Sequence, residues 1–155
     1  MKFSAKEDIE APIEFVFEQI TDFTSFERSA LRRGAEVQRV DNLNRQGPGM
    51  QWDASFKYRG RIREVNIELV SMDPPNGMVI GSRSASMGGE MVVELVALSR
   101  GRTRMSAELE MHPKNLSARL LVQSLKLARN TLNKRFRKRV ATFAEDIEER
   151  FKKSA

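Results

Sequence analysis

The stretch LVQSLKLARNTLNKRFRKRVATFAEDI, residues 121–147, decides the fold of this chain. Its apolar side chains recur about every 3.7 residues, which is the period of an amphipathic α-helix. They are Leu121, Leu125, Ala128, Leu132, Phe136, Val140, Phe143 and Ile147. A single helix cannot bury this stripe alone, so the stretch predicts one long C-terminal helix that packs on a surface supplied by the upstream chain.

Six strand-like runs lie upstream and can form that surface. They cover residues 35–41, 49–58, 61–72, 77–86, 90–99 and 102–111. Short turn signals such as Gly88-Gly89 separate them, so we expect antiparallel neighbours. Apolar residues alternate with polar ones, which predicts that one face meets a core and the other meets water. A curved antiparallel sheet that grips one long helix leaves a space between them, so the pattern predicts a cavity.

The N-terminal region adds one strand and two short helices. Residues 2–10 alternate weakly and predict the strand. After Pro12, apolar residues with helical spacing predict the first helix, namely Ile13, Val16, Phe17 and Ile20. Thr24 and Glu27 have capping-box spacing, which predicts that the second helix starts at Thr24. Gly34 is expected to end it.

The length of the C-terminal helix sets a further constraint. A continuous helix from Asn115 to Phe151 would span about 55 Å at 1.5 Å per residue. A compact chain of this length is only about 40 Å across. The helix is therefore expected either to overhang the sheet or to break in its first turns.

Composition limits the class of protein. A length of 155 residues predicts a single domain, residues 1–155. The absence of cysteine excludes disulfides and thiol nucleophiles. No apolar run approaches the roughly 18 residues of a membrane span, and the charged N-terminus has no apolar core of a secretory signal. We therefore expect a cytoplasmic protein.

The net charge of +6 is unevenly distributed. Residues 1–110 hold 15 basic and 17 acidic side chains, whereas residues 111–155 hold 12 basic and 4 acidic ones. On a helical projection one outer face gathers basic residues and leucines, namely Arg119, Lys126, Lys134, Arg137, Lys138, Leu116, Leu120 and Leu127. This face fits an anionic membrane surface, a protein groove, a homodimer contact or plain solvated surface, which is the commonest case. Nucleic acid is disfavoured, because aromatic residues are not interleaved with the charge.

The segment IEAPIEFVFEQITDF, residues 9–23, resembles the opening signature of the START-like, or SRPBCC, superfamily. The matching positions are Ala11, Pro12, Glu14, Val16, Phe17, Asp22 and Phe23. The order of the predicted elements resembles the same superfamily over the whole chain, and most closely its polyketide cyclase/dehydrase-like or lipid-transport-like bacterial members. The resemblance implies an α+β helix-grip fold, with a curved seven-stranded antiparallel sheet wrapped around a long C-terminal helix and two short helices between strands 1 and 2.

The resemblance also implies an apolar ligand in the cavity between the sheet and the C-terminal helix. From their inward phase, the expected lining residues are Trp52, Ala54, Phe56, Tyr58, Arg63, Ile67, Met78, Ile80, Met105, Ala107, Leu121, Leu125 and Ala128. Arg63 offers a bidentate contact to a carboxylate or phosphate, and Trp52 and Tyr58 offer N–H and O–H donors. Each of these side chains taken alone is better explained as part of a solid core, whereas for the whole set the resemblance favours a cavity.

Three functions remain open from the sequence. The leading hypothesis is binding or carriage of a hydrophobic or amphipathic small molecule such as a lipid, an isoprenoid or a polyketide-like compound. The second is a polyketide cyclase/dehydrase-type enzyme that uses the same cavity, and the third is a protein that binds a partner or a membrane surface through the basic helix. His112 is the only histidine, and no group of residues has metal-ligand spacing, so we expect no metal or cofactor.

Overall fold

The computed structural model describes residues 1–154, which form seven strands and four helices. The strands are β1 (Lys2–Ile9), β2 (Glu36–Arg39), β3 (Gln51–Tyr58), β4 (Arg61–Asp73), β5 (Gly77–Arg83), β6 (Met87–Ser99) and β7 (Arg102–Pro113). The helices are α1 (Ile13–Ile20), α2 (Phe23–Arg32), α3 (Leu116–Lys126) and α4 (Arg129–Ser154). The predicted order is confirmed, because α1 and α2 lie between β1 and β2 and a long helical region follows β7.

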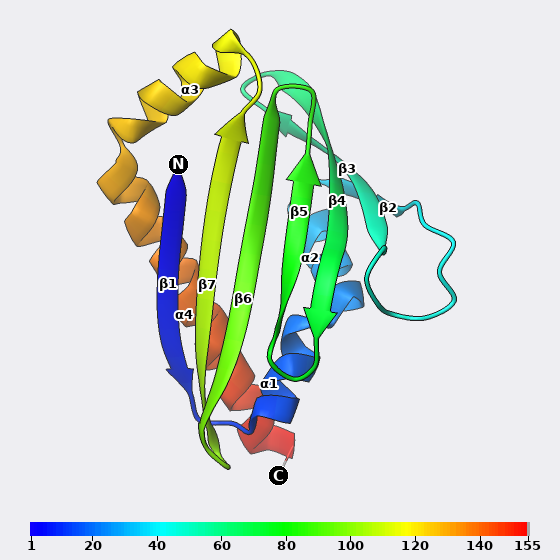
Figure 1. The fold of residues 1–155 in the computed structure, drawn as a ribbon, viewed down its shortest axis with the longest axis vertical. Helices are drawn as coiled ribbons and strands as arrows, with labels where there is room; N and C mark the ends of the chain where they lie inside the picture. Colours follow the sequence, from blue (N-terminus) through cyan, green and yellow to red (C-terminus); the bar gives the residue numbers. More distant parts are fainter. Residues whose placement is uncertain (155) are drawn as a thin grey trace.

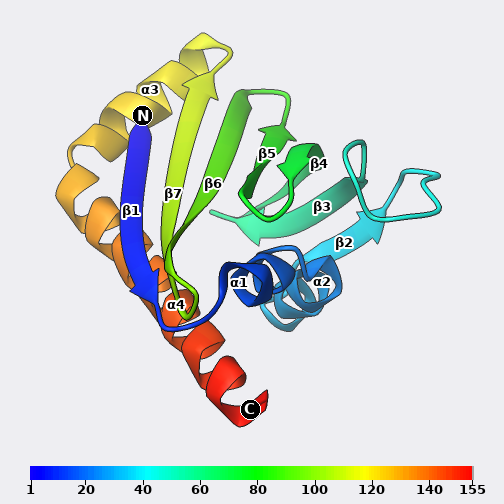
Figure 2. The same cartoon turned by 60° about the horizontal axis from the view of Figure 1, so that its bottom comes forward.

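All seven strands form one antiparallel sheet in the spatial order β1-β7-β6-β5-β4-β3-β2 (Figure 1). Strands β2 to β7 are neighbours in chain order, and β1 pairs with β7 so that Ala5 faces Ala107. Figure 2 shows that the sheet is strongly curved, with β3 running across the direction of β1. This is the α+β helix-grip fold that the sequence predicts.

Because the sheet is antiparallel, successive connections between strands lie alternately at two opposite ends of the molecule. Because each strand reverses the one before it, the β3–β4 and β5–β6 connections and the end of β7 lie together at what we call the upper end (Figure 1). The β4–β5 and β6–β7 turns and α1 lie at the lower end. The upper and lower ends differ in what covers the sheet.

Helices α1, α2 and α4 pack on the concave face and complete the core. Ile9, Ile20, Leu69 and Ile147 are fully buried there. The fully buried hydroxyl of Thr103 donates a hydrogen bond of 2.8 Å to a backbone carbonyl, as a buried polar group requires. The core therefore depends on the end of α4 and on α1, far along the chain from each other.

The C-terminal helical region is broken, which is one of the two outcomes that its length allowed. Between α3 and α4, the amide of Leu127 donates to the carbonyl of Ser124 at 3.2 Å, and the amide of Ala128 donates to the carbonyl of Leu125 at 3.0 Å. Each of these bonds joins residue i to residue i−3, whereas an α-helix joins residue i to residue i−4. A tight turn therefore interrupts the α-helical hydrogen-bond pattern. In residues 1–154, no helix combines the length and apolar character that crossing a membrane requires.

The break corrects the predicted stripe upstream of α4. The buried residues of α3 are Ala118 and Val122. Leu121 and Leu125 are only half-buried, and Ala128 is exposed. The stripe is correct along α4 but wrong in α3, because a uniform helical period does not continue through a tight turn.

A second correction concerns Gly88-Gly89, which is not a turn. Both glycines lie within β6, and the turn is at Ser84, whose hydroxyl accepts the amide of Met87 at 3.0 Å. A Cβ added at Gly89 would lie 2.7 Å from the hydroxyl oxygen of Ser82 on β5. The glycine therefore leaves room for the Ser82 side chain of the neighbouring strand and does not reverse the chain.

The third correction concerns the start of α2. The helix begins at Phe23, and the side chain of Asp22 accepts the amide of Ser25 at 3.3 Å, so Asp22 is the N-cap in place of Thr24. The capping box predicted with Glu27 does not form. The Glu27 carboxylate is directed to the concave face of the sheet, where it has a different partner.

Candidate functional site: an apolar groove between sheet and helices

A groove of about 540 Å³ lies between the concave face of the sheet and helices α2 and α4. Its walls are formed by Ile20, Phe23, Phe26, Glu27, Ala30, Val37, Trp52, Ile67, Met78, Ile80, Met91, Val93, Met105, Ala107, Leu109, Phe136, Arg139, Val140 and Phe143. The groove is open to solvent. Its volume falls within the roughly 300–1,000 Å³ of small-molecule sites.

The strand side of the groove follows from simple alternation. Trp52, Ile67 and Ile80 occupy inward positions of β3, β4 and β5, and Ile67 lies directly opposite Trp52 in the ladder. Methionines at positions 78, 91 and 105 add flexible apolar surface that adapts to irregular shapes. The small side chain of Ala107 leaves space where a larger residue would fill the groove.

Pairs of aromatic rings join the helices to the groove walls. Phe23 of α2 lies 5.4 Å from Trp52 between ring centroids, and Phe26 lies 5.8 Å from Phe143 of α4. Phe136 meets Phe3 of β1 at 6.1 Å. Tilted contacts at these separations are favourable beyond simple burial. They fix α2 and α4 relative to the sheet while the groove between them stays open.

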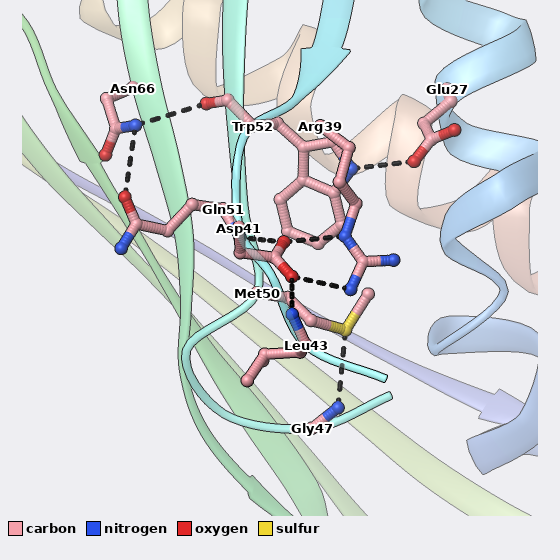
Figure 3. Close-up of polar contacts among 9 residues, drawn as sticks. All are labelled: Glu27, Arg39, Asp41, Leu43, Gly47, Met50, Gln51, Trp52 and Asn66. Carbon is pink, nitrogen blue, oxygen red and sulfur yellow. Dashed lines mark hydrogen bonds and ion pairs between the residues drawn. The ribbon is translucent and has the colours of Figure 1, made fainter. Parts of the chain in front are cut away.

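Trp52 is the best-defined side chain of the groove. It is only 5% exposed, and its indole N–H donates a hydrogen bond of 2.7 Å to the Glu27 carboxylate (Figure 3). An indole N–H is a donor only, and it needs a partner when it is buried. The short bond to a charged acceptor therefore locks the indole ring in one orientation.

A second charged group supports Trp52 from β2. The Arg39 guanidinium lies 5.9 Å from the centre of the indole ring and makes a two-pronged ion pair with Asp41, with distances of 2.6 and 3.0 Å (Figure 3). The Asp41 carboxylate also accepts the amides of Gln51 and Leu43, both at 2.9 Å. The bond from Arg39, followed by that from Gln51, holds the pKa of Asp41 well below its usual range. This network fixes the end of β3 that carries Trp52.

Arg139 is the second charged residue on the groove wall. It extends from α4 and is exposed to solvent. Within residues 1–154 its guanidinium has no hydrogen-bond or ion-pair partner. The groove therefore has an apolar interior and two charged groups on its wall. The Glu27 carboxylate already accepts a hydrogen bond from Trp52, whereas the Arg139 guanidinium is available to a bound molecule.

Six of the thirteen predicted lining residues form the groove. They are Trp52, Ile67, Met78, Ile80, Met105 and Ala107. All six lie on strands, at positions where the alternation of β3, β4, β5 and β7 turns the side chain inward. The structure brings these six together from four strands that are distant in sequence.

The other seven predicted residues lie outside the groove, and we correct those positions here. Ala54 is buried beside β2, and Phe56, Tyr58 and Arg63 lie toward the upper end, where they are exposed. Alternation gives them the correct face, but no helix covers that part of the sheet. The remaining three, Leu121, Leu125 and Ala128, lie in or after α3, upstream of the α4 segment that borders the groove.

The sequence prediction missed the helical side of the groove. The α4 wall is formed by Phe136, Val140 and Phe143, which belong to the predicted apolar stripe but were expected only to fill the core. The α2 wall, with Phe26, Glu27 and Ala30, carried no expectation. Its signal was available, because Phe23, Phe26 and Ala30 have the spacing of one helical face.

Residues 1–154 contain no group of three or more His, Asp or Glu side chains placed to hold a metal ion. His112 lies in β7, and its ring is exposed and 3.8 Å from the Glu110 carboxylate. It does not border the groove.

Comparisons with known proteins identify a matching family model and several structures with a similar fold. A family model described as polyketide cyclase/dehydrase and lipid transport matches residues 1–148. The structure is similar to the ZhuI aromatase/cyclase from Streptomyces sp. R1128, with a TM-score of 0.64 and 14% identity over 97% of this chain and 94% of that one. The protein TTHA0849 from Thermus thermophilus gives a TM-score of 0.65 and 17% identity over 100% and 99% of the two chains.

A third similar structure is that of a START superfamily protein from Mycobacterium smegmatis. It gives a TM-score of 0.56 and 13% identity, over 90% of this chain and 98% of that one. No curated protein sequence matches the chain. At these low identities the structural similarities concern the fold alone.

Proposed function

We propose that this chain, which belongs to the polyketide cyclase/dehydrase and lipid transport family of the START-like superfamily, binds a hydrophobic or amphipathic small molecule in the groove between its sheet and α4. The observation that carries the proposal is an open groove of about 540 Å³ whose walls are apolar except for Glu27 and Arg139. Water in such a groove lacks polar partners, so an apolar guest replaces it favourably.

Burial of apolar area is the driving force of the proposed binding. Each Å² of apolar surface removed from water contributes about 25 cal/mol before the costs of association are subtracted. Because no ring of polar side chains lines the interior, affinity depends on size and shape more than on directed hydrogen bonds. This favours a class of ligands, such as lipids, isoprenoids or polyketide-like compounds, over one chemically exact partner.

The two charged wall residues orient the proposed ligand. Glu27 is engaged by the Trp52 indole at 2.7 Å, whereas Arg139 is exposed. A polar or anionic group of an amphipathic ligand would therefore lie at Arg139, and its apolar part would extend toward Met78 and Val93 in the groove.

Filling the groove tests the proposal. Ala30→Trp places a large ring at the α2 wall, so uptake of the fluorescent probe 1-anilinonaphthalene-8-sulfonate should fall by at least about tenfold. Ala128→Trp adds the same ring at an exposed position outside the groove and should leave uptake unchanged. Thermal melting of both variants verifies that they fold. Equal uptake by wild type and Ala30→Trp would show that the probe does not bind in the groove.

Native mass spectrometry of the freshly purified protein gives an independent result. A co-purifying apolar molecule in the wild type, absent from Ala30→Trp and present in Ala128→Trp, supports carriage in the groove. A protein that is empty, and that also fails to take up the fluorescent probe, contradicts the proposal.

A second candidate function is a cyclase/dehydrase-type enzyme, and the Glu27 carboxylate on the groove wall is the observation that favours it. A carboxylate beside an apolar ligand can accept a proton in a reaction that eliminates water. This function predicts that a bound polyketide-like substrate loses the mass of one water and that Glu27→Gln prevents the loss without preventing binding. An unchanged mass after prolonged incubation favours carriage.

A further inference from the structure

The upper end of the molecule exposes an apolar surface that the groove does not explain. Leu116 and Leu120 lie one turn apart on α3 and are 70% and 62% exposed, and Leu127 at the end of α3 is 92% exposed. Across the upper end, Ile62 of β4 is 75% exposed beside the β3–β4 turn. Isolated surface leucines are ordinary, but several large apolar residues grouped at one end of a molecule are typical of a contact surface.

Basic residues predominate in the two segments that carry these apolar side chains. The β3–β4 connection reads KYRGRIR at residues 57–63, with four basic residues and no acid. Residues 111–144, which include α3, contain nine basic residues and no acid. In the part of the chain that the structure describes, Arg59, Arg61 and Arg119 have no ion-pair partner. Their charge is therefore available to an anionic surface.

The two segments lie at the same end of the fold. Figure 1 shows the β3–β4 connection at the upper end, and α3 begins at the same end because it follows the end of β7. The antiparallel order of β3 to β7 requires this placement, because alternate connections return to the same end. One extended surface can therefore contact both segments.

The charge along α4 gives the molecule an orientation. Residues 129–144 carry six basic and no acidic side chains, whereas residues 145–154 carry four acidic and three basic ones. The positive part of α4 adjoins α3, and the part with the acids lies at the lower end (Figure 1). An anionic surface would therefore attract the upper end first.

We propose that the upper end docks on an anionic lipid bilayer. Leu116, Leu120 and Ile62 enter the boundary between headgroups and acyl chains, while Arg59, Arg61 and Arg119 contact lipid phosphates. We call this set the docking surface. Exposed aliphatic side chains within a basic surface are typical of interfacial membrane contacts, which combine apolar insertion with attraction to anionic lipids.

Nucleic acid fits the same charge less well. It offers phosphates and stacking faces, but it offers no apolar layer for leucine and isoleucine side chains. A bilayer satisfies both the charge and the aliphatic groups. The proposal does not depend on the groove, so a failure of either one leaves the other intact.

Vesicle co-sedimentation tests the docking surface. The wild type should bind vesicles of phosphatidylcholine with about 30 mol% phosphatidylglycerol at least about tenfold more strongly than vesicles of phosphatidylcholine alone. Raising the salt concentration to about 0.5 M should remove most of this preference, because exposed charges are then screened over a few ångströms. Equal binding to both vesicle types, or to neither, overturns the proposal.

Two matched pairs of substitutions to glutamate test whether membrane binding depends on the docking surface or on exposed apolar side chains anywhere on the molecule. Leu116→Glu combined with Leu120→Glu should reduce binding to the anionic vesicles by at least about tenfold. Val96→Glu combined with Leu98→Glu places the same charges at exposed positions near the lower end of β6 and should bind like the wild type. Circular dichroism verifies the fold of both variants. Equal loss in the two variants overturns the proposal.

Insertion can be observed directly because the chain contains no cysteine. A single environment-sensitive fluorophore at Ile62→Cys should brighten and shift to the blue with the anionic vesicles, and the same label at Val96→Cys should not. This measurement also covers the case in which a glutamate variant fails to fold. An unchanged signal at position 62, or displacement of the protein from the vesicles by an equimolar RNA or DNA oligonucleotide, overturns the proposal.

Discussion

The upper and lower ends of the sheet obey the same alternation but differ in what covers them. At the lower end, Ile20 of α1 and Ile147 of α4 pack on inward strand residues and are fully buried. At the upper end, β3 continues its inward face through Phe56 and Tyr58, yet these side chains are 39% and 45% exposed. Identical strand chemistry therefore leads to a core at one end and to an accessible surface at the other.

The cause of the difference lies in the helices. Helix α4 follows the sheet toward α1, and Phe15 of α1 meets Phe151 of α4 at 5.1 Å. Helix α3, beyond the break, buries only Ala118 and Val122. The comparison shows that strand alternation predicts the face of a side chain, whereas its burial depends on whether a helix covers that part of the sheet.

The strongest test of the comparison is a pair of truncations. Ile147→Ala should lower the free energy of unfolding by about 2–5 kcal/mol, because it opens a cavity in the closed core. Leu120→Ala at the upper end should change it by no more than about 0.5 kcal/mol, because that side chain is already in water. Urea denaturation of both variants measures the difference. Similar losses would mean that α3 is packed as tightly as α4.

Much of the fold, and the strand side of the groove, could be predicted from the sequence, because these features have a local basis. The segment IEAPIEFVFEQITDF and the strand pattern predicted the order of elements, and the length of the last helix allowed its break. The six strand residues of the groove followed from alternation, which is a property of each strand alone.

The remainder depends on contacts between distant segments. The position of the break could not be read from the periodicity, because Leu121, Leu125 and Ala128 continue the helical spacing through it. The role of Glu27 could not be read from its capping-box spacing, because its partner, Trp52, is 25 residues away. Gly89 looks like a turn residue until β5 is placed against it.

Two aromatic residues of β3 give the next largest expected contrast. Trp52→Phe removes the donor to Glu27 and part of the buried ring, so it should cost about 1–3 kcal/mol of unfolding free energy. Tyr58→Phe removes an exposed hydroxyl and should cost no more than about 0.5 kcal/mol. Chemical denaturation compares the two variants. Glu27→Gln, which keeps an acceptor for the indole, should lie between them, and a loss greater than that of Trp52→Phe would contradict the assigned bond.

Acid titration tests the Asp41–Arg39 network that supports Trp52, and its expected effect on stability is smaller. The hydrogen bond from Arg39 lowers the pKa of Asp41 in the folded protein, so this carboxylate contributes stability above the unfolded pKa of about 4 and loses it as the pH falls through the folded pKa. Asp41→Asn should therefore weaken the loss of stability that occurs as the pH falls below about 4.

Asp8 provides the comparison for this titration. Arg104 lowers its pKa in the same direction, but the side chain of Asp8 is 28% exposed and that of Asp41 only 6%. Asp8→Asn should therefore reduce the acid-induced loss of stability less than Asp41→Asn does. Denaturant midpoints measured across the pH range decide between them, and an equal response would show that the Asp41 pair is no better shielded than the surface pair.

Removal of the two helix caps is expected to have the smallest effect on stability. It also tests whether α3 unfolds together with the core. Asp22 accepts the amide of Ser25 at the start of α2, and Asn115 accepts the amide of Ala118 at 2.8 Å at the start of α3. Removing a cap typically costs about 1 kcal/mol. We expect Asp22→Ala to show this cost in global unfolding, because α2 is part of the closed region. Asn115→Ala should instead leave global unfolding within about 0.5 kcal/mol and accelerate hydrogen exchange of α3 amides alone, because a helix with two buried residues can open locally. A global loss as large as that of Asp22→Ala would mean that α3 unfolds together with the core, and the distinction between the two ends of the sheet would then not hold.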